Sequence, residues 1–157
     1  MRRETIFLRA VVIAIGLAVL ALISYPIPYI TVKASGYFPS HILYPIVAFI
    51  YASAVPFFIA LFQALNLLGL IDKDKAFSEA SVGALGKIKW CAASVTGIYA
   101  MCSPFLYLAA EMDDAPGFVA GGLILTSAAL VIAVFAAILE KLLRRAIDIK
   151  AENDLTV

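Results

Sequence analysis

The chain has 157 residues, of which 64% are apolar and 15% are charged, and its formal net charge is +1. A soluble domain contains about 45–50% apolar residues, so the composition excludes an ordinary soluble fold, and a nearly neutral charge gives no indication of direct nucleic-acid binding. The charges are also confined to a few short segments, which is typical of an integral membrane protein.

Four apolar stretches are long enough to cross a hydrocarbon layer about 30 Å thick, which takes about 20 helical residues. They cover residues 6–25, 42–71, 88–110 and 117–139. The sequence therefore predicts an all-α fold, a four-span transmembrane helix bundle that forms a single domain over residues 1–157.

The basic residues predict the orientation of these spans. Only Lys33 lies between spans one and two, and eleven others lie on the opposite side: Arg2, Arg3, Arg9, Lys73, Lys75, Lys87, Lys89, Lys141, Arg144, Arg145 and Lys150. Positive residues accumulate in short cytoplasmic segments. Both termini, the loop 72–87 and the tail 140–157 are therefore predicted to be cytoplasmic, while residues 26–41 and 111–116 face outward.

The first two spans differ in length. Span one carries a stripe of small residues (Ala10, Ala14 and Ala18) that permits close helix packing, and Pro26 and Pro28 end it. Residues 31–40 read as a loop. Span two would reach roughly 45 Å as a helix, longer than the hydrocarbon layer, and Pro56 predicts a kink near its middle.

The loop 72–87, here called the charged knot, concentrates Asp72, Lys73, Asp74, Lys75 and Glu79 between two apolar runs. Ser78 is a plausible N-cap. The apolar spacing that follows predicts a short helix lying on the inner membrane surface before span three begins.

Spans three and four contain further packing and capping signals. Pro104 predicts a second kink, and Asp113 or Asp114 is expected to cap span four. "GFVAG" is a GxxxG pattern at Gly117 and Gly121, and three alanines continue it: Ala129, Ala133 and Ala137. Past residue 139 the helix is expected to continue as an amphipathic extension, with a stripe made of Leu139, Leu142, Leu143, Ala146 and Ile147.

Eight polar side chains within the spans carry no ionisable group, and each is expected to form hydrogen bonds between helices. They are Ser53, Gln63, Asn66, Ser94, Thr96, Ser103, Thr126 and Ser127. Proton-coupled carriers usually place an ionisable group at this depth. A transporter would instead need a polar cleft formed by Gln63, Asn66 and Ser103.

No catalytic, cofactor-binding or metal-binding pattern is recognisable in the sequence. A polar set on the outer side (His41, Glu111, Asp113 and Asp114) contains residue types that bind metals or sense protons. These residues come from two loops without ligand spacing, so helix capping in a hydrated loop explains them. We expect no enzyme, no cofactor and no metal.

The cytoplasmic surface combines basic and apolar side chains that a docking protein would use. The candidates are Asp72, Lys75, Phe77, Ser78, Leu85, Leu142, Arg145 and Ile147. Attraction to anionic membrane lipids, about 1 kcal/mol per basic residue near the surface, explains the same charges equally well.

Three segments resemble a family of small bacterial membrane proteins, the domain of unknown function 2975 family. They are "YPIVAFIYASAVPFFIALFQALNLLGLIDKDKAFSEASVGALGKIKWCA", "PFLYLAAEMDDAPG" and "LRRAIDIKAENDLTV". The resemblance covers nearly the whole chain and is most specific in the charged knot and the tail. It implies four spans in the bacterial cytoplasmic (inner) membrane and no assigned catalytic residue. Members of this family are often encoded beside a small helix-turn-helix DNA-binding regulator.

Three functions are compatible with these features. The leading hypothesis is a non-enzymatic regulator that docks a small helix-turn-helix protein on its cytoplasmic face. The second is a small transporter or efflux component, in which a homodimer completes a path through the polar cleft. The third is a membrane stress or immunity protein that binds an amphipathic peptide.

Overall fold

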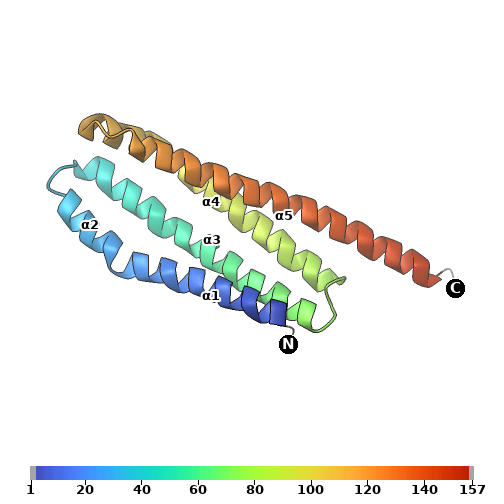
Figure 1. The fold of residues 1–157 in the computed structure, drawn as a ribbon. Helices are drawn as coiled ribbons and strands as arrows, with labels where there is room; N and C mark the ends of the chain where they lie inside the picture. The colour runs from blue at the N-terminus through green and yellow to red at the C-terminus, as the bar shows by residue number, and fades with distance from the viewer. Residues whose placement is uncertain (1–2, 156–157) are drawn as a thin grey trace.

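The computed structural model of the protein describes residues 3–155, and all the regular secondary structure within this range is helical. The elements are α1 (Arg3–Ser24), α2 (Pro26–Ala34), α3 (Ser40–Asp72), α4 (Glu79–Asp113) and α5 (Gly117–Leu155) (Figure 1). Arg2 and the last two residues of the predicted cytoplasmic tail lie outside the described residues.

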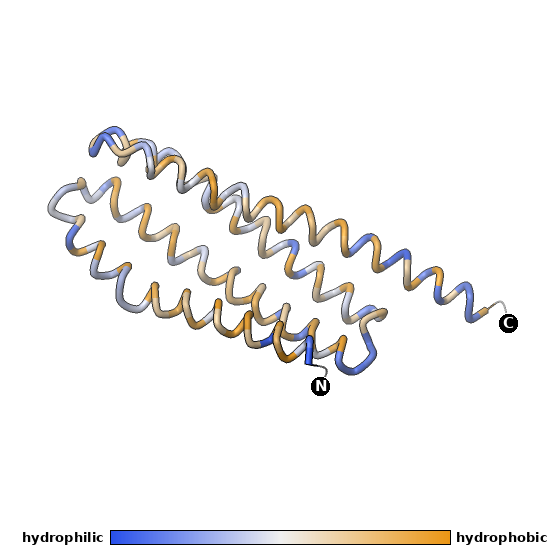
Figure 2. Tube along the Cα trace, in the orientation of Figure 1, coloured by the Kyte–Doolittle hydropathy of each residue, from blue (hydrophilic) through white to orange (hydrophobic). Residues whose placement is uncertain are grey.

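Four helical segments are long and apolar enough to cross a membrane, as the sequence predicts. They are Arg3–Ala34, Ser40–Asp72, Glu79–Asp113 and Gly117–Leu155. Hydrophilic residues gather at the two ends of these segments and along the end of α5 (Figure 2). The charged knot and both described chain ends lie at the same end of the molecule (Figure 1), which is called the knot end below.

The first span is longer than the sequence predicts, because α2 continues α1 after a bend. Pro26 and Pro28 lack an N–H, but Tyr25 and Tyr29 still donate their backbone N–H groups to Ala21 and Tyr25, at 3.3 and 3.1 Å. The helical turns therefore resume on the far side of the prolines. The expected loop over residues 31–40 is corrected accordingly, since its first four residues belong to α2.

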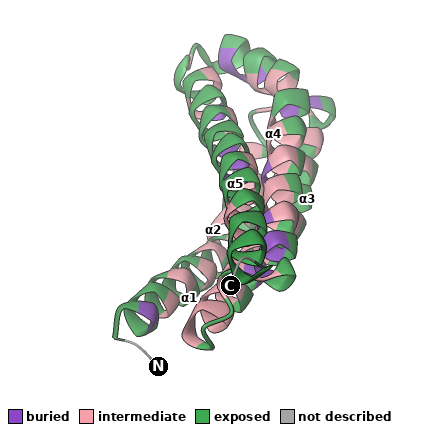
Figure 3. Ribbon diagram, turned by 90° about the vertical axis from the view of Figure 1, so that its right-hand side faces the viewer, coloured by how far each residue is buried: buried purple, intermediate pink, exposed green. Residues whose placement is uncertain are grey.

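The helices form an open row rather than a closed bundle. Within residues 3–155, α1 and α2 have no Cα atom within 8 Å of α4 or α5, and α3 has none within 8 Å of α5. The order in space is therefore α1–α3–α4–α5, with α2 extending α1, and α1 diverges from α5 in the second view (Figure 3). Within residues 3–155 the first and last spans therefore do not meet.

The contact between α4 and α5 is the most extensive in the protein, and small residues make it possible. Ala129, Ala133 and Ala136 are buried. A Cβ atom added to Gly122 would lie 2.6 Å from Leu106 Cδ1, whereas one added to Gly117 or Gly121 would meet nothing within 4 Å. The close approach therefore uses Gly122 and the alanines below it, and not the glycine pair of the GxxxG pattern.

The predicted stripe of small residues on span one does not pack against another helix. Ala10, Ala14 and Ala18 are all exposed in α1, so this stripe faces away from the other helices. Contact with α3 uses Gly16 instead, where an added Cβ would lie 3.3 Å from Leu61 Cδ1. On the far side of α3, Ser53 Oγ and the Tyr99 hydroxyl of α4 form a hydrogen bond of 2.9 Å.

Two further expectations about helix boundaries need revision. α4 begins at Glu79 and continues to Asp113, so the short surface helix predicted before span three is the first part of the spanning helix itself. Asp114 has a left-handed backbone, with φ of 49°, and donates its N–H to the Ala110 carbonyl. It therefore ends α4, whereas the sequence suggested a cap at the start of span four.

Candidate functional site at the knot end

Between α3 and α4, the backbone of the charged knot forms a hydrogen-bonded turn. Lys75 donates its N–H to the Leu70 carbonyl at 2.8 Å, and Asp74 adopts a left-handed backbone with φ of 57°. The Lys75 carbonyl then accepts hydrogen bonds from the hydroxyl groups of Ser78, at 2.6 Å, and Ser81, at 3.0 Å. One carbonyl thus joins the end of α3 to the start of α4.

Ser78 is the N-cap of α4, as predicted. Its Oγ accepts a hydrogen bond of 3.4 Å from the Ser81 N–H, which satisfies one of the backbone donors that a helix start leaves free. Ser81 is fully buried. Both serines therefore shape the knot, and the Lys75 side chain projects from a fixed backbone.

Asp72 connects two helices instead of projecting into solvent. Its carboxylate lies 3.2 Å from the Arg9 guanidinium of α1, and only 10% of its side chain is exposed. Gly69 leaves space for this arginine, since an added Cβ would lie 3.4 Å from Arg9 Nη2. The ion pair joins the first span to α3. Asp72 is therefore not freely available to a docking partner, although the sequence placed it among the docking residues.

A second ion pair joins α4 to α5. Lys89 Nζ lies 2.8 Å from Glu140 Oε2, and Arg144 lies 4.0 Å from the other oxygen of the same carboxylate. Gly86 faces Glu140 closely enough that an added Cβ would lie 3.4 Å from its Oε1. This pair fixes α5 against α4 at the level of Glu140. Its signal in the sequence was a lone acidic residue following the apolar run of span four.

The predicted docking residues divide into exposed and buried groups. Phe77 is 58% exposed and Leu142 is 57% exposed. Arg145 is exposed as well, while Ile147 is half-buried. Leu85 is only 8% exposed, so it packs inside the protein and cannot line a docking surface. The three-residue spacing that suggested a membrane-surface helix reflects packing of α4 instead.

The end of α5 carries an exposed apolar side chain that sequence analysis missed. Ile149 is 66% exposed and follows Leu142 by seven residues, which places both on one face of the helix. The surface around Ile149 on this part of α5 also includes Ala146, Lys150, Glu152 and Asn153. The seven-residue spacing was present in the sequence, but the predicted stripe stopped at Ile147.

The three residues of the predicted polar cleft do not come together. Gln63 is buried and Asn66 is exposed on the same helix. Ser103 lies in α4 and donates its hydroxyl to the Tyr99 carbonyl of its own helix, at 3.1 Å. Tyr99, one turn before Ser103, contacts Ser53 of α3, and Ser53 precedes Gln63 by ten residues, so Ser103 and Gln63 lie at different levels of the helix row.

Most hydroxyl groups within the spans bond to their own helix, contrary to the expectation of bonds between helices. Ser94, Thr96 and Thr126 donate to the carbonyl four residues earlier, at 2.7–2.9 Å. Such bonds satisfy the hydroxyl locally and hold no neighbouring helix. The exceptions are Ser53, which also contacts the Tyr99 hydroxyl of α4, and Tyr51, which donates to the Ile23 carbonyl of α1.

The polar set at the opposite end of the molecule is dispersed. His41, Glu111, Asp113 and Asp114 are all exposed. Within residues 3–155, no three His, Cys, Asp or Glu side chains are grouped closely enough to hold a metal ion. Asp113 lines a cavity together with residues of α2 and the following turn.

Comparison with known proteins agrees with these features. Residues 30–157 match the family described as "Protein of unknown function (DUF2975)". The chain is 49% identical over 158 residues to "Uncharacterized membrane protein YoaS" of Bacillus subtilis (strain 168), with 99% of each chain covered. No solved structure matches the chain.

Proposed function

The chain belongs to the domain of unknown function 2975 family of membrane proteins, and from this premise we propose that it is a non-enzymatic regulator. Its cytoplasmic face would hold a small helix-turn-helix DNA-binding protein at the bacterial inner membrane. The surface that would do so is the end of α5, residues 140–155, here called the α5 arm. Release of the bound protein would change transcription without any chemical step.

The observation that carries this proposal is the exposed apolar face of the α5 arm. α5 is one helix of 39 residues, and it extends beyond the other helices at the knot end (Figure 1). Leu142 and Ile149 stay exposed one heptad apart. An amphipathic helix from a partner binds such a face by burying side chains at this spacing.

Charge supports a partner with an acidic face. Arg145 and Lys150 flank the apolar face and are exposed. Cations at the rim of an interface raise the association rate and favour partners of opposite charge. An anionic lipid surface would attract the same cations and would also bury Leu142 and Ile149, so co-purification of the regulator decides between the two.

The spans are coupled to the α5 arm through the Lys89–Glu140 pair. Glu140 lies where the α5 arm begins, and the 2.8 Å bond to Lys89 fixes α5 against α4 at that level. A shift of α4 relative to α5 would therefore move the whole α5 arm. A conformational change in the spans would thereby be transmitted to the docking face.

Co-purification tests the proposal directly. The full-length protein is expressed with a small helix-turn-helix regulator of the kind often encoded beside members of this family, and is purified in mild detergent. The double substitution Leu142→Lys and Ile149→Lys is expected to reduce recovery of the regulator by more than tenfold. Burying such side chains contributes about 1.5–3 kcal/mol each, and 1.4 kcal/mol is a factor of ten in affinity.

A control with the same added charge is Ala151→Lys with Leu155→Lys. These positions lie on the opposite side of the same helix, because residues 2 and 6 beyond Ile149 are rotated away from it. The control is expected to retain the regulator. If the wild-type protein recovers no regulator, or if both double variants lose it equally, the docking role is rejected.

A further inference from the structure

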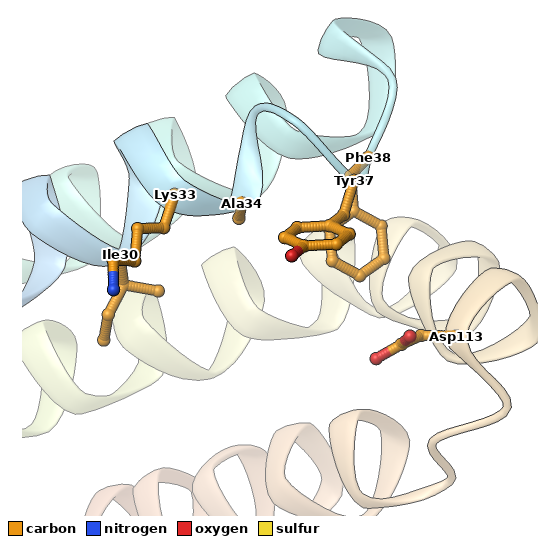
Figure 4. Close-up of a pocket in the computed structure, with 6 residues that line it drawn as sticks. All are labelled: Ile30, Lys33, Ala34, Tyr37, Phe38 and Asp113. Carbon is orange, nitrogen blue, oxygen red and sulfur yellow. The ribbon is translucent and has the colours of Figure 1, made fainter.

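A cavity lies at the end of the molecule opposite the charged knot, beside α2. Its volume is about 380 Å³, and it is lined by Ile30, Lys33, Ala34, Tyr37, Phe38 and Asp113. The first three belong to α2, the next two to the turn that follows, and Asp113 to the end of α4 (Figure 4). Residues from two separate spans therefore line one open cavity.

The turn that forms one wall is held in place on both sides. Tyr37 and Phe38 both donate their N–H groups to the Ala34 carbonyl at 2.9 Å. The Phe38 ring packs edge-on against Phe118 of α5, with centroids 6.1 Å apart. The wall is thus fixed to α2 by hydrogen bonds and to α5 by an aromatic contact.

The two charged residues of the cavity have opposite signs and come from different elements. Within residues 3–155, neither Lys33 nor Asp113 forms an ion pair with another residue. Lys33 Nζ lies 4.8 Å from the centre of the Tyr29 ring. Figure 4 shows the Asp113 carboxylate across the cavity from Tyr37 and Phe38, with Lys33 further along α2. A ligand that carries both a cation and an anion would complement this arrangement.

The depth of the cavity identifies the source of such a ligand. The cavity lies where the apolar spans end, which is the level of the lipid headgroups. Tyrosines mark this level in membrane proteins, and Tyr25, Tyr29 and Tyr44 are exposed nearby in the chain. Ile30 is also exposed, so the cavity is continuous with a lipid-facing surface of α2.

We propose that this cavity binds the headgroup of a zwitterionic phospholipid that carries a primary ammonium group, as in phosphatidylethanolamine. Asp113 takes the ammonium group and Lys33 takes the phosphate, while Ile30 and Ala34 contact the apolar part of the lipid. A free zwitterion shares the headgroup chemistry but has no apolar part for these two residues. The proposal is independent of the cytoplasmic docking role.

Native mass spectrometry of the full-length protein tests this site. The protein is incubated with equimolar phosphatidylethanolamine and phosphatidylglycerol that have identical acyl chains. One charge near the membrane surface contributes about 1 kcal/mol, or about a fivefold change in binding. We expect about fivefold preferential retention of phosphatidylethanolamine by the wild-type protein and no preference in Asp113→Asn. Lys33→Gln is expected to retain less of both lipids.

Asp114→Asn is the matched control, because this neighbouring carboxylate does not line the cavity. It is expected to keep the wild-type preference. Equal retention of both lipids by the wild-type protein, or an equal loss in Asp114→Asn and Asp113→Asn, would overturn the proposal. Displacement of the lipid by glycerophosphoethanolamine at the same concentration would also overturn it, since the ligand would then be a soluble zwitterion.

Discussion

The two edges of the helix row are held in different ways. At one edge, α5 packs along α4 through buried alanines, with Gly122 against Leu106 and an ion pair at Glu140. At the other edge, α1 touches only α2 and α3, and Thr5 is its only buried residue in the described range. One edge is therefore a packed interface, whereas the other is joined to the protein at a few points.

Those points of attachment are specific and lie far apart along α1. Arg9 pairs with Asp72 near one end, Gly16 meets Leu61 near the middle, and the Tyr51 hydroxyl donates to the Ile23 carbonyl at 3.2 Å near the other end. Since lipid tails are as apolar as the side chains between these points, little else favours association of α1 with α3.

The largest difference in stability is expected between two alanine-to-leucine variants, one in the alanine stripe of each edge. Ala133→Leu adds bulk at a buried position of α5, and overpacking there should reduce the free energy of unfolding by about 3 kcal/mol. Ala14→Leu lies on the exposed stripe of α1, so it should change stability by less than about 0.5 kcal/mol. Denaturation in mixed micelles, followed by circular dichroism, measures both. Equal losses would remove the distinction between the edges.

The second effect concerns the ion pair of the packed edge. Glu140→Gln leaves Lys89 without its partner and should reduce stability by about 1–2 kcal/mol. This is less than the 3–5 kcal/mol of a fully buried pair, because 27% of the Lys89 side chain and 16% of the Glu140 side chain are exposed. Arg144→Gln is the control, since a pair four residues apart on one helix contributes only about 0.2–0.5 kcal/mol. An equally large loss in both variants would contradict this assignment.

A third substitution addresses the loosely held edge. Asp72→Asn removes the charge opposite Arg9 and should lower overall stability by about 1–2 kcal/mol, less than for a fully buried pair, because 27% of the Arg9 side chain and 10% of the Asp72 side chain are exposed. Its main effect should be local, with faster amide hydrogen exchange in α1 and unchanged exchange in α4 and α5. Hydrogen exchange with mass spectrometry resolves these regions, and α4 and α5 are the internal control. Uniform acceleration would show that α1 is as tightly integrated as the other helices.

The smallest effect tests the contact between the two central helices. Ser53→Ala removes the hydrogen bond to Tyr99 and should reduce stability by about 0.6 kcal/mol, the average for such bonds in membranes. Ser103→Ala removes a bond that stays within α4 and should cost less than about 0.3 kcal/mol. The same denaturation assay measures the difference, and a larger loss in Ser103→Ala would show that helix-internal hydroxyls also hold neighbours together.

Hydropathy was sufficient to predict the number of spans, because each must carry about 20 apolar residues. It did not predict how the helices pack. Ala10, Ala14 and Ala18 repeat with the same spacing as Ala129 and Ala133, yet the first set is exposed and the second is buried. Spacing identifies a face of a helix, but the partner of that face depends on which helices meet.

The candidate site was also only partly predictable. The N-cap at Ser78 follows from local chemistry and was found correctly. The sequence placed Asp72 and Leu85 on an exposed surface, but Asp72 is paired with Arg9 and Leu85 is buried. The Asp72 ion pair joins residues distant in sequence, and the burial of Leu85 depends on how α4 packs. No local sequence pattern predicts either. Ile149 was missed because the apolar stripe was followed for too few turns.

Cysteine cross-linking tests the open row most directly. In a background with Cys91 and Cys102 replaced by alanine, one variant carries Gly16→Cys with Leu61→Cys, and another carries Ala14→Cys with Leu139→Cys. Disulfide formation needs Cα atoms within about 7 Å. We expect an intramolecular disulfide in the first variant and none in the second. Rapid formation of the second link within one chain would show that α1 meets α5 in a closed bundle and would contradict the account.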